Sequence, residues 1–191
     1  MNLNIVIGGV GGQGTLLASR ILGALAIELG QDVKASEVHG MAQRGGSVIT
    51  FLRMGNSIFV PVVETACADY VLAFEMLEAA RALPYLKKGG TLITNTQEIS
   101  PMPVIIGKAP YPGDILEKLN VKCNVMAFDA LQMAREAGEA RAVNLVLLGA
   151  LARFTGFDIG AWHSAIEKSV PLKLRAVNMD AFDRGYRYIN Q

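Results

Sequence analysis

Two glycine-rich stretches near the start of the chain carry the residues best suited to hold a ligand. Residues 8–14 read Gly-Gly-Val-Gly-Gly-Gln-Gly, and residues 37–47 read Glu-Val-His-Gly-Met-Ala-Gln-Arg-Gly-Gly-Ser. Glycines let a backbone turn sharply and approach a ligand, and a helix that follows offers free N–H groups to an anion. We therefore predict binding rather than catalytic residues here. The candidates are Gly9, Gly11, Gly12, Gln13, Gly14, Glu37, His39, Gln43, Arg44, Gly45 and Gly46.

The first stretch lies between the apolar run 4–7 and a segment from Thr15 with apolar residues at three- and four-residue spacing. This order indicates a strand, a tight turn and a helix. Residues 9–14 fit the dinucleotide fingerprint, and Glu37 stands near the end of the second predicted strand, where an acid that binds ribose is expected. Two interpretations stay open: the glycines bind phosphate or nucleotide, or they only allow close packing of strand and helix.

The second stretch leads into further strand-like sequence. Residues 47–54 and 58–63 read as strands on either side of a turn signal, so we predict a hairpin. The polar loop 37–46 should lie beside the first glycine loop at the carboxyl edge of the sheet. Arg44 is suited to bidentate pairing with a carboxylate or phosphate. His39 is either a titrating group near neutral pH or a hydrogen-bonding scaffold residue.

Strand-like and helix-like segments alternate along the rest of the chain. The predicted strands are 69–74, 91–95, 104–106 and 121–128, and the predicted helices are 76–86, closed by 87–90, then 115–119, 129–138, 144–154, 161–169 and 174–189. This alternation predicts an α/β fold, a three-layer α/β/α sandwich with a Rossmann-like, mainly parallel sheet and a β-hairpin insertion. We expect a single domain over residues 1–191.

Composition excludes several functions. The 191 residues carry a formal net charge of +1, so no electrostatic footprint for nucleic acid or an acidic membrane surface is present. The longest apolar stretch, residues 145–152, is far shorter than the ~20 residues of a membrane span. With no basic leader segment visible, we expect a cytoplasmic protein. The 51% hydrophobic and 18% charged residues favour buried interfaces, and hence a homodimer or a complex.

The two cysteines limit the metal chemistry. Cys67 and Cys123 lie far apart in sequence, and neither belongs to a CxxC pair. They cannot supply an iron–sulfur or zinc site alone, and we expect them to be buried thiols.

Taken together, the two glycine-rich stretches are recognisable. Gly-x-Gly-Gly-Gln-Gly, residues 9–14, and Ser-Glu-Val-His-Gly-Met-Ala-Gln-Arg-Gly-Gly, residues 36–46, resemble the gamma-type subunits of 2-oxoacid:ferredoxin oxidoreductases. The likeness covers essentially the whole chain, including residues 69–75 and 141–144. The pyruvate and oxoglutarate branches usually read Tyr-Gly-Pro-Glu-x-Arg-Gly-Gly in the second stretch, whereas the form here is similar to the aryl-pyruvate, or indolepyruvate, branch.

The resemblance implies the small subunit of a complex that oxidatively decarboxylates a 2-oxoacid to an acyl-CoA and reduces ferredoxin. It implies thiamine diphosphate, iron–sulfur clusters and coenzyme A in the assembled complex, with a large subunit as partner. The only Gly-Asp pair, Gly113-Asp114, lacks the rest of a thiamine diphosphate motif, so we expect this chain alone to bind no cofactor and to be inactive. Its loops should shape the thiamine or coenzyme A cavity or contact the large subunit. The alternatives are a self-contained NAD- or FAD-binding oxidoreductase and a noncatalytic interaction module.

Overall fold

The computed structural model of the chain describes residues 2–42 and 45–188. Its strands are β1 (Leu3–Val10), β2 (Asp32–His39), β3 (Ser47–Gly55), β4 (Ala68–Ala73), β5 (Leu86–Asn95) and β6 (Asn124–Phe128). Its helices are α1 (Thr15–Glu28), α2 (Met76–Ala82), α3 (Met102–Ile105), α4 (Ile115–Lys122), α5 (Ala130–Glu136), α6 (Val143–Thr155), α7 (Ile159–Ser169) and α8 (Arg175–Tyr188). Within these residues no helix is both long and apolar enough to cross a bilayer.

The strands form one sheet in the order β2-β3-β1-β4-β5-β6. The neighbours β1, β4, β5 and β6 run parallel, and β3 runs antiparallel between β1 and β2. The mainly parallel sheet is therefore confirmed. The insertion of β3 departs from the usual dinucleotide-binding order, in which the first two strands are neighbours.

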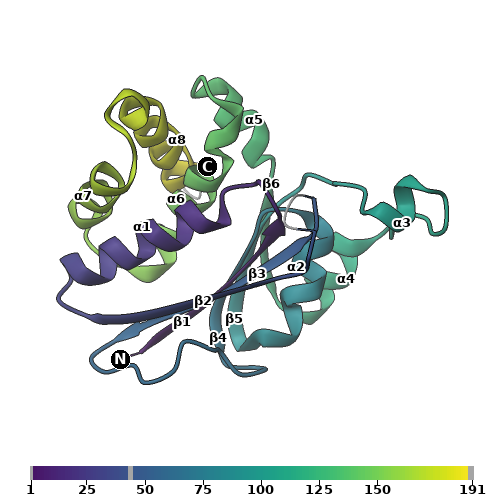
Figure 1. The fold of residues 1–191 in the computed structure, drawn as a ribbon, viewed down its shortest axis with the longest axis horizontal. Coiled ribbons are helices and arrows are strands. Elements are labelled where there is room, and N and C mark those ends of the chain that lie inside the picture. Colours follow the sequence, from purple (N-terminus) through teal and green to yellow (C-terminus); the bar gives the residue numbers. More distant parts are fainter. Residues whose placement is uncertain (1, 43–44, 189–191) are drawn as a thin grey trace.

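Helices cover both faces of the sheet and make three layers (Figure 1). Along β1, Ile5 and Ile7 are buried in the cluster with α1 and α6, whereas Val6 is buried in the cluster with α2 and α4. This alternation is the period of two that a strand imposes. The predicted α/β/α sandwich is confirmed.

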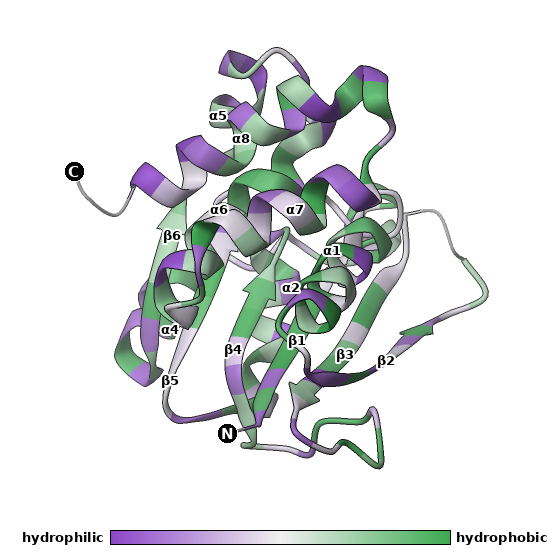
Figure 2. Ribbon diagram, turned by 90° about the vertical axis from the view of Figure 1, so that its left-hand side faces the viewer, coloured by the Kyte–Doolittle hydropathy of each residue, from purple (hydrophilic) through white to green (hydrophobic). Residues whose placement is uncertain are grey.

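Helix α6 is the centre of the thicker helical layer. All ten residues from Val143 to Ala152 are buried, and Figure 2 shows the hydrophobic colours on this helix and the central strands. Helices α6 and α8 meet backbone to backbone, because a Cβ on Gly149 would lie 2.0 Å from the Phe182 oxygen and one on Gly185 would lie 1.9 Å from the Val146 oxygen. These two glycines permit the close crossing.

The predicted hairpin was wrong in its second strand. Residues 58–63 form no strand, and the hairpin consists of β2 and β3. Strand β3 has β1 on one edge and β2 on the other, so it offers no free edge to the following segment. Side chains hold that segment instead: Asp32 accepts the Ile58 N–H at 2.9 Å, and Arg53 donates to the Val60 carbonyl at 3.4 Å.

Four smaller predictions were also wrong. The loop expected from residue 37 begins only after His39, because β2 pairs with β3 over its whole length. Residues 104–106 are not a strand, since α3 occupies Met102–Ile105. Residues 87–90 belong to β5 rather than to a helix end, because α2 stops at Ala82 and Pro84 lies in a 3₁₀ turn. Cys67 is exposed rather than buried.

Candidate functional site

The first glycine loop connects β1 to α1 through two left-handed residues. Gly12 has φ +105° and Gly14 has φ +89°, conformations that L side chains rarely adopt. A Cβ on Gly14 would also lie 2.7 Å from Asn144 Nδ2. Helix α1 starts after Gly14 without a side-chain cap. The N–H groups of its first turn are therefore left for solvent or a ligand.

The second glycine stretch lies directly against the first. The Gly11 N–H donates to the Gly46 carbonyl at 2.8 Å, and the Gly45 N–H donates to the Gly11 carbonyl at 3.2 Å. Gly45 has φ +77°, and a Cβ on Gly46 would lie 2.4 Å from the Ala42 oxygen. The prediction that the two stretches lie side by side at the carboxyl edge is confirmed. Gln43 and Arg44 lie outside the described residues.

A groove of about 500 Å³ opens between the two stretches. It is lined by Gly11, Gly12, Gly14, Thr15, Leu16, Glu37, His39 and Val48. The structure therefore brings Glu37 and His39 to the glycine loop. Because β3 separates their strand from β1, Glu37 stands two strand spacings away, about 10 Å. Glu37 accepts from Thr50 Oγ1 at 3.3 Å, and His39 Nδ1 lies 3.1 Å from the Gly40 carbonyl.

Gln13 acts within the scaffold. Its Oε1 accepts the Val10 N–H at 2.8 Å, and its Nε2 donates to the Phe74 carbonyl at 3.1 Å. The amide thereby ties the carboxyl ends of β1 and β4 together, and a ligand at this amide would compete with both bonds. Gly9 also serves packing, since a Cβ there would lie 2.8 Å from the Thr15 methyl group.

A second groove, of about 370 Å³, lies on the other side of the glycine loop. Its lining comprises Gly12, Gln13, Gly14, Gln97, Ile99, Leu131, Ala140, Arg141 and Val143. Arg141 pairs with Glu139, whose Oε1 lies 3.3 Å from the Arg141 Nε. The glycine loop is thus a ridge between two grooves, one polar with Glu37 and one with a largely apolar wall.

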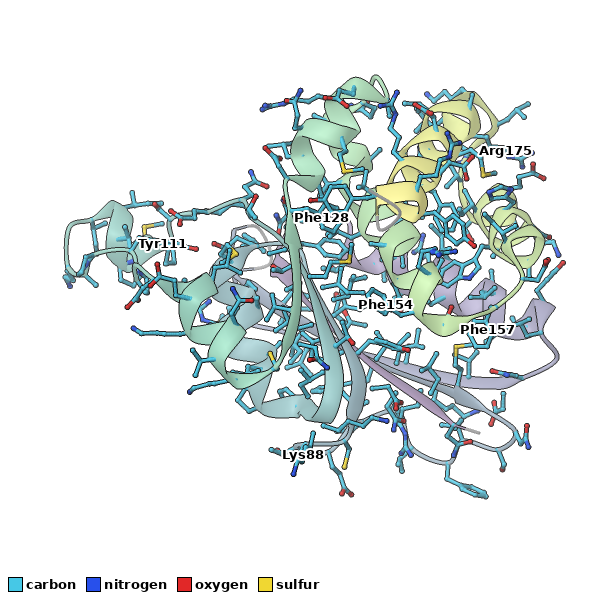
Figure 3. All side chains as sticks on the ribbon, turned by 180° about the vertical axis from the view of Figure 1, so that it is seen from behind. Lys88, Tyr111, Phe128, Phe154, Phe157 and Arg175 are labelled. Carbon is cyan, nitrogen blue, oxygen red and sulfur yellow. The ribbon has the colours of Figure 1, made fainter. Side chains whose placement is uncertain are left out.

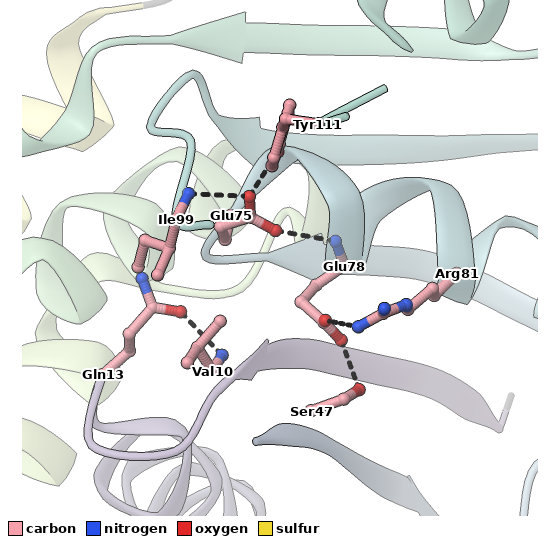
Figure 4. A network of polar contacts seen from close by, with 8 residues as sticks. All are labelled: Val10, Gln13, Ser47, Glu75, Glu78, Arg81, Ile99 and Tyr111. Carbon is pink, nitrogen blue, oxygen red and sulfur yellow. Dashed lines mark hydrogen bonds and ion pairs between the residues drawn. The ribbon is translucent and has the colours of Figure 1, made fainter. Parts of the chain in front are cut away.

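Two buried glutamates at the start of α2 were missed in the sequence (Figure 4). Glu75 caps α2 by accepting the Glu78 N–H at 2.9 Å, and it also accepts the Ile99 N–H at 3.0 Å and the Tyr111 hydroxyl. Burial raises the pKa of Tyr111 well above its usual range, and the hydrogen bond to Glu75 adds to the rise. Tyr111 therefore stays protonated as a donor.

The second glutamate reaches the other loop. Glu78 accepts the Ser47 hydroxyl at 2.5 Å and pairs with Arg81. Since Ser47 directly follows Gly46, α2 holds both the second glycine stretch and the segment after β5. The signal in the sequence was an acid immediately after a buried strand, followed three residues later by another acid at a helix start.

The described side chains do not fit an iron–sulfur cluster. No group of three or more His, Cys, Asp or Glu among residues 2–42 and 45–188 is placed to hold a metal ion. Cys67 and Cys123 precede β4 and β6, two parallel strands, so both thiols lie at the amino edge of the sheet. The glycine stretches lie at the carboxyl edge.

Comparisons with known proteins show the family of the chain. Residues 4–188 match the family described as pyruvate ferredoxin/flavodoxin oxidoreductase. Indolepyruvate oxidoreductase subunit IorB of Pyrococcus horikoshii is 45% identical over 96% of this chain and 94% of its own length. The subunit of the same name from Thermococcus kodakarensis is 44% identical over the same shares.

A solved structure shares the fold. The gamma subunit of keto/oxoacid ferredoxin oxidoreductase from Geobacter sulfurreducens has a TM-score of 0.73 at 24% identity, covering 97% of this chain and 96% of that chain. The resemblance seen in the two glycine stretches is confirmed. The chain belongs to the pyruvate ferredoxin/flavodoxin oxidoreductase family and is the small, gamma-type subunit of a 2-oxoacid:ferredoxin oxidoreductase.

Proposed function

We propose that the complex containing this subunit acts on indolepyruvate and related aryl pyruvates. It would release the carboxylate as CO₂, transfer the acyl unit to coenzyme A and pass two electrons to ferredoxin. The two archaeal relatives named for indolepyruvate support the substrate class, because both match nearly the full chain at 45% and 44% identity. The form of residues 39–42, His-Gly-Met-Ala, supports the same branch.

In this proposal the subunit supplies a binding surface and no redox centre. Thiamine diphosphate and the clusters would be held by the larger subunit, since the described side chains of this chain lack the donors for a cluster. The cofactors carry the hard chemistry, and the protein supplies binding and orientation. The role left to this chain is to present its carboxyl edge to the larger subunit or to coenzyme A.

The groove beside Glu37 is the proposed coenzyme A surface. The uncapped start of α1 offers N–H groups to a phosphate, and the carboxylate of Glu37 would repel a phosphate placed next to it. A phosphate should therefore lie at the glycine side, with a hydroxyl group near Glu37. The observation that carries this proposal is the pair of backbone hydrogen bonds in which the Gly11 N–H donates to Gly46 and the Gly11 carbonyl accepts from Gly45, because these bonds join both stretches into one surface.

The test is purification of the tagged subunit from its own host under anaerobic conditions. We expect a larger, iron–sulfur-containing protein to copurify. The complex should reduce ferredoxin with indolepyruvate and coenzyme A faster than with pyruvate or 2-oxoglutarate. The subunit alone should be colourless and inactive. A chain that stays alone and binds NAD or FAD at micromolar concentration would instead establish the self-contained nucleotide enzyme.

A further inference from the structure

Helix α3 stands away from the body of the molecule (Figure 1). It belongs to the segment between β5 and α4, residues 96–114, which we call the arm. Met102, Ile105 and Ile106 of the arm are 64%, 65% and 55% exposed. Their spacing of three and four residues places them on one side of the helical turn. The arm therefore presents a compact group of three large apolar side chains to solvent.

The arm is held in place at its base. Glu75 accepts the Ile99 N–H on one side of the arm and the Tyr111 hydroxyl on the other. Figure 3 shows Tyr111 on the arm, at the opposite end of the molecule from Arg175. The buried carboxylate of Glu75, the residue that caps α2, thus holds both sides of the base of the arm, so the arm is preorganised and would lose little freedom on binding.

The tip of the arm is also internally bonded. The Ile105 N–H donates to the Pro101 carbonyl at 3.1 Å, and the Lys108 N–H donates to the Pro103 carbonyl at 2.8 Å. Gly107 closes the turn with φ +71°. The exposure of the apolar side chains is therefore a property of a formed helical turn.

The chemistry of the tip fits a protein groove. Residues 99–107 carry no charge, and Glu98 and Lys108 flank them. An apolar centre with a polar rim is the usual composition of a protein interface. Three side chains cannot supply the roughly 800 Å² per partner of a stable interface. Tip-to-tip contact with a second copy is therefore too small, and the tip requires a partner that surrounds it and contacts neighbouring surface as well.

The neighbouring surface is the carboxyl edge. Gln97 and Ile99, at the base of the arm, line the second groove beside the glycine loop. A protein that covers this edge is thus continuous with one that surrounds the arm. We infer that the arm docks into an apolar groove of the larger subunit through Met102, Ile105 and Ile106. This inference rests on the proposed function, in which the chain is the small subunit of a complex with a larger subunit.

The test uses the double variant Ile105→Ser/Ile106→Ser. The affinity of this variant for the purified larger subunit is measured by interferometry. The melting temperature of the variant subunit is measured in the absence of the larger subunit. Docking would bury only the 65% and 55% of the Ile105 and Ile106 surfaces that are exposed in the isolated subunit, so the loss of both side chains should raise the Kd about 20- to 400-fold. The melting temperature should stay within a degree or two, because both side chains are exposed in the isolated subunit. The matched control is Ile27→Ser, an isoleucine 71% exposed on α1, which should leave the Kd unchanged.

A second variant tests the anchor. Tyr111→Phe keeps the apolar tip and removes one bond to Glu75, so we expect a smaller rise in Kd, of about 3- to 10-fold, from the loss of preorganisation.

Each outcome decides the inference. Wild-type affinity in the double variant overturns the docking arm and leaves the proposed function intact. A wild-type subunit that does not bind the larger subunit overturns both. A wild-type homodimer that the double variant converts to a monomer assigns the arm to a second copy and overturns the docking inference.

Discussion

The Ser47 hydroxyl donates to the buried carboxylate of Glu78 across 2.5 Å, joining the first residue of β3 to α2. The backbone of the same residue pairs with Val10, the last residue of β1. The second glycine stretch is therefore held from two directions where it meets the first. The side-chain bond spans 31 residues of sequence and sets the position of one wall of the polar groove.

Replacing Ser47 with Ala should destabilise the subunit. The change leaves Glu78 buried with Arg81 as its remaining side-chain partner, and a hydrogen bond to a charged group contributes about 1.5–3 kcal/mol. Urea unfolding of the isolated subunit measures the loss. Ser57→Ala, at an exposed serine just after β3, is the control and should be neutral. Equal stability of the two variants would show that the Ser47 bond contributes nothing.

The two left-handed glycines should differ in their cost of substitution. Gly12→Ala meets open space and carries only the backbone strain of φ +105°, about 1–2 kcal/mol. Gly14→Ala carries similar strain and also forces the new methyl group against Asn144 Nδ2, so it should cost about 1–3 kcal/mol more. Thermal melting of both variants distinguishes them. A smaller loss for Gly14→Ala would contradict the packing described here.

An added negative charge in the polar groove should weaken coenzyme A binding. Leu16 lines the groove and is 51% exposed, so Leu16→Glu should fold normally while repelling a phosphate. We expect the KM for coenzyme A to rise about 10-fold, with the KM for the 2-oxoacid unchanged. The matched control is Ile27→Glu near the other end of α1. An unchanged KM in the Leu16 variant would place coenzyme A elsewhere.

Arg44, outside the described residues, keeps the role predicted from its sequence context. Arg44→Ala should leave the melting temperature of the isolated subunit unchanged. It should weaken assembly or raise the KM for coenzyme A, since breaking a desolvated bidentate contact costs roughly 2–5 kcal/mol. Arg44→Lys should restore only part of the loss, because an ammonium lacks the planar fork. A variant that melts far below wild type and retains full activity per folded complex would make Arg44 structural.

Alkaline pH should remove the stabilisation that Tyr111 gives to the subunit. Burial and Glu75 raise the pKa of Tyr111, so as pH rises the unfolded chain releases this proton first, near the ordinary tyrosine pKa of about 10. The stabilisation that protonated Tyr111 provides is therefore complete below pH ~10. It is lost as pH rises toward the higher pKa of Tyr111 in the folded state. Urea unfolding from pH ~8 to ~11 should show the difference between wild type and Tyr111→Phe shrinking above pH ~10. Tyr85→Phe, whose parent ring packs on Phe51, is the control.

Turns and helix starts were predicted well from the sequence, because the residues that determine them lie within a few positions of one another. Glycines after a short apolar run predicted the turn between β1 and α1, and Asp129 correctly marked the start of α5, where it accepts the Gln132 N–H. The segment 104–106 was mistaken for a strand because its residues are β-branched. Pro101 and Pro103 favour a helix start there, and the projecting arm has no strand beside it.

The arrangement of the site depends on distant residues. Nothing within residues 32–55 specifies that β3 inserts between β1 and β2, since this requires pairing with residues 3–10. The partners through which Glu75 and Glu78 hold other segments, Ser47, Ile99 and Tyr111, lie 24 to 36 residues away in sequence. The convergence of the two glycine stretches was predictable because both follow strands that end at one edge. The hydrogen-bond network of Glu75 and Glu78 was not predictable, because the sequence spacing of its members follows neither a helical nor a strand period.

Because α8 is synthesised after α6, the close crossing of these two helices affects folding during synthesis. Helix α6 is apolar on all sides, and its outer face is covered by α8, which begins at Arg175, 20 residues after α6 ends. A nascent chain that has completed the sheet therefore still exposes one face of α6 until α8 emerges and docks at Gly149. Transiently exposed apolar surface of this kind makes folding intermediates prone to aggregation.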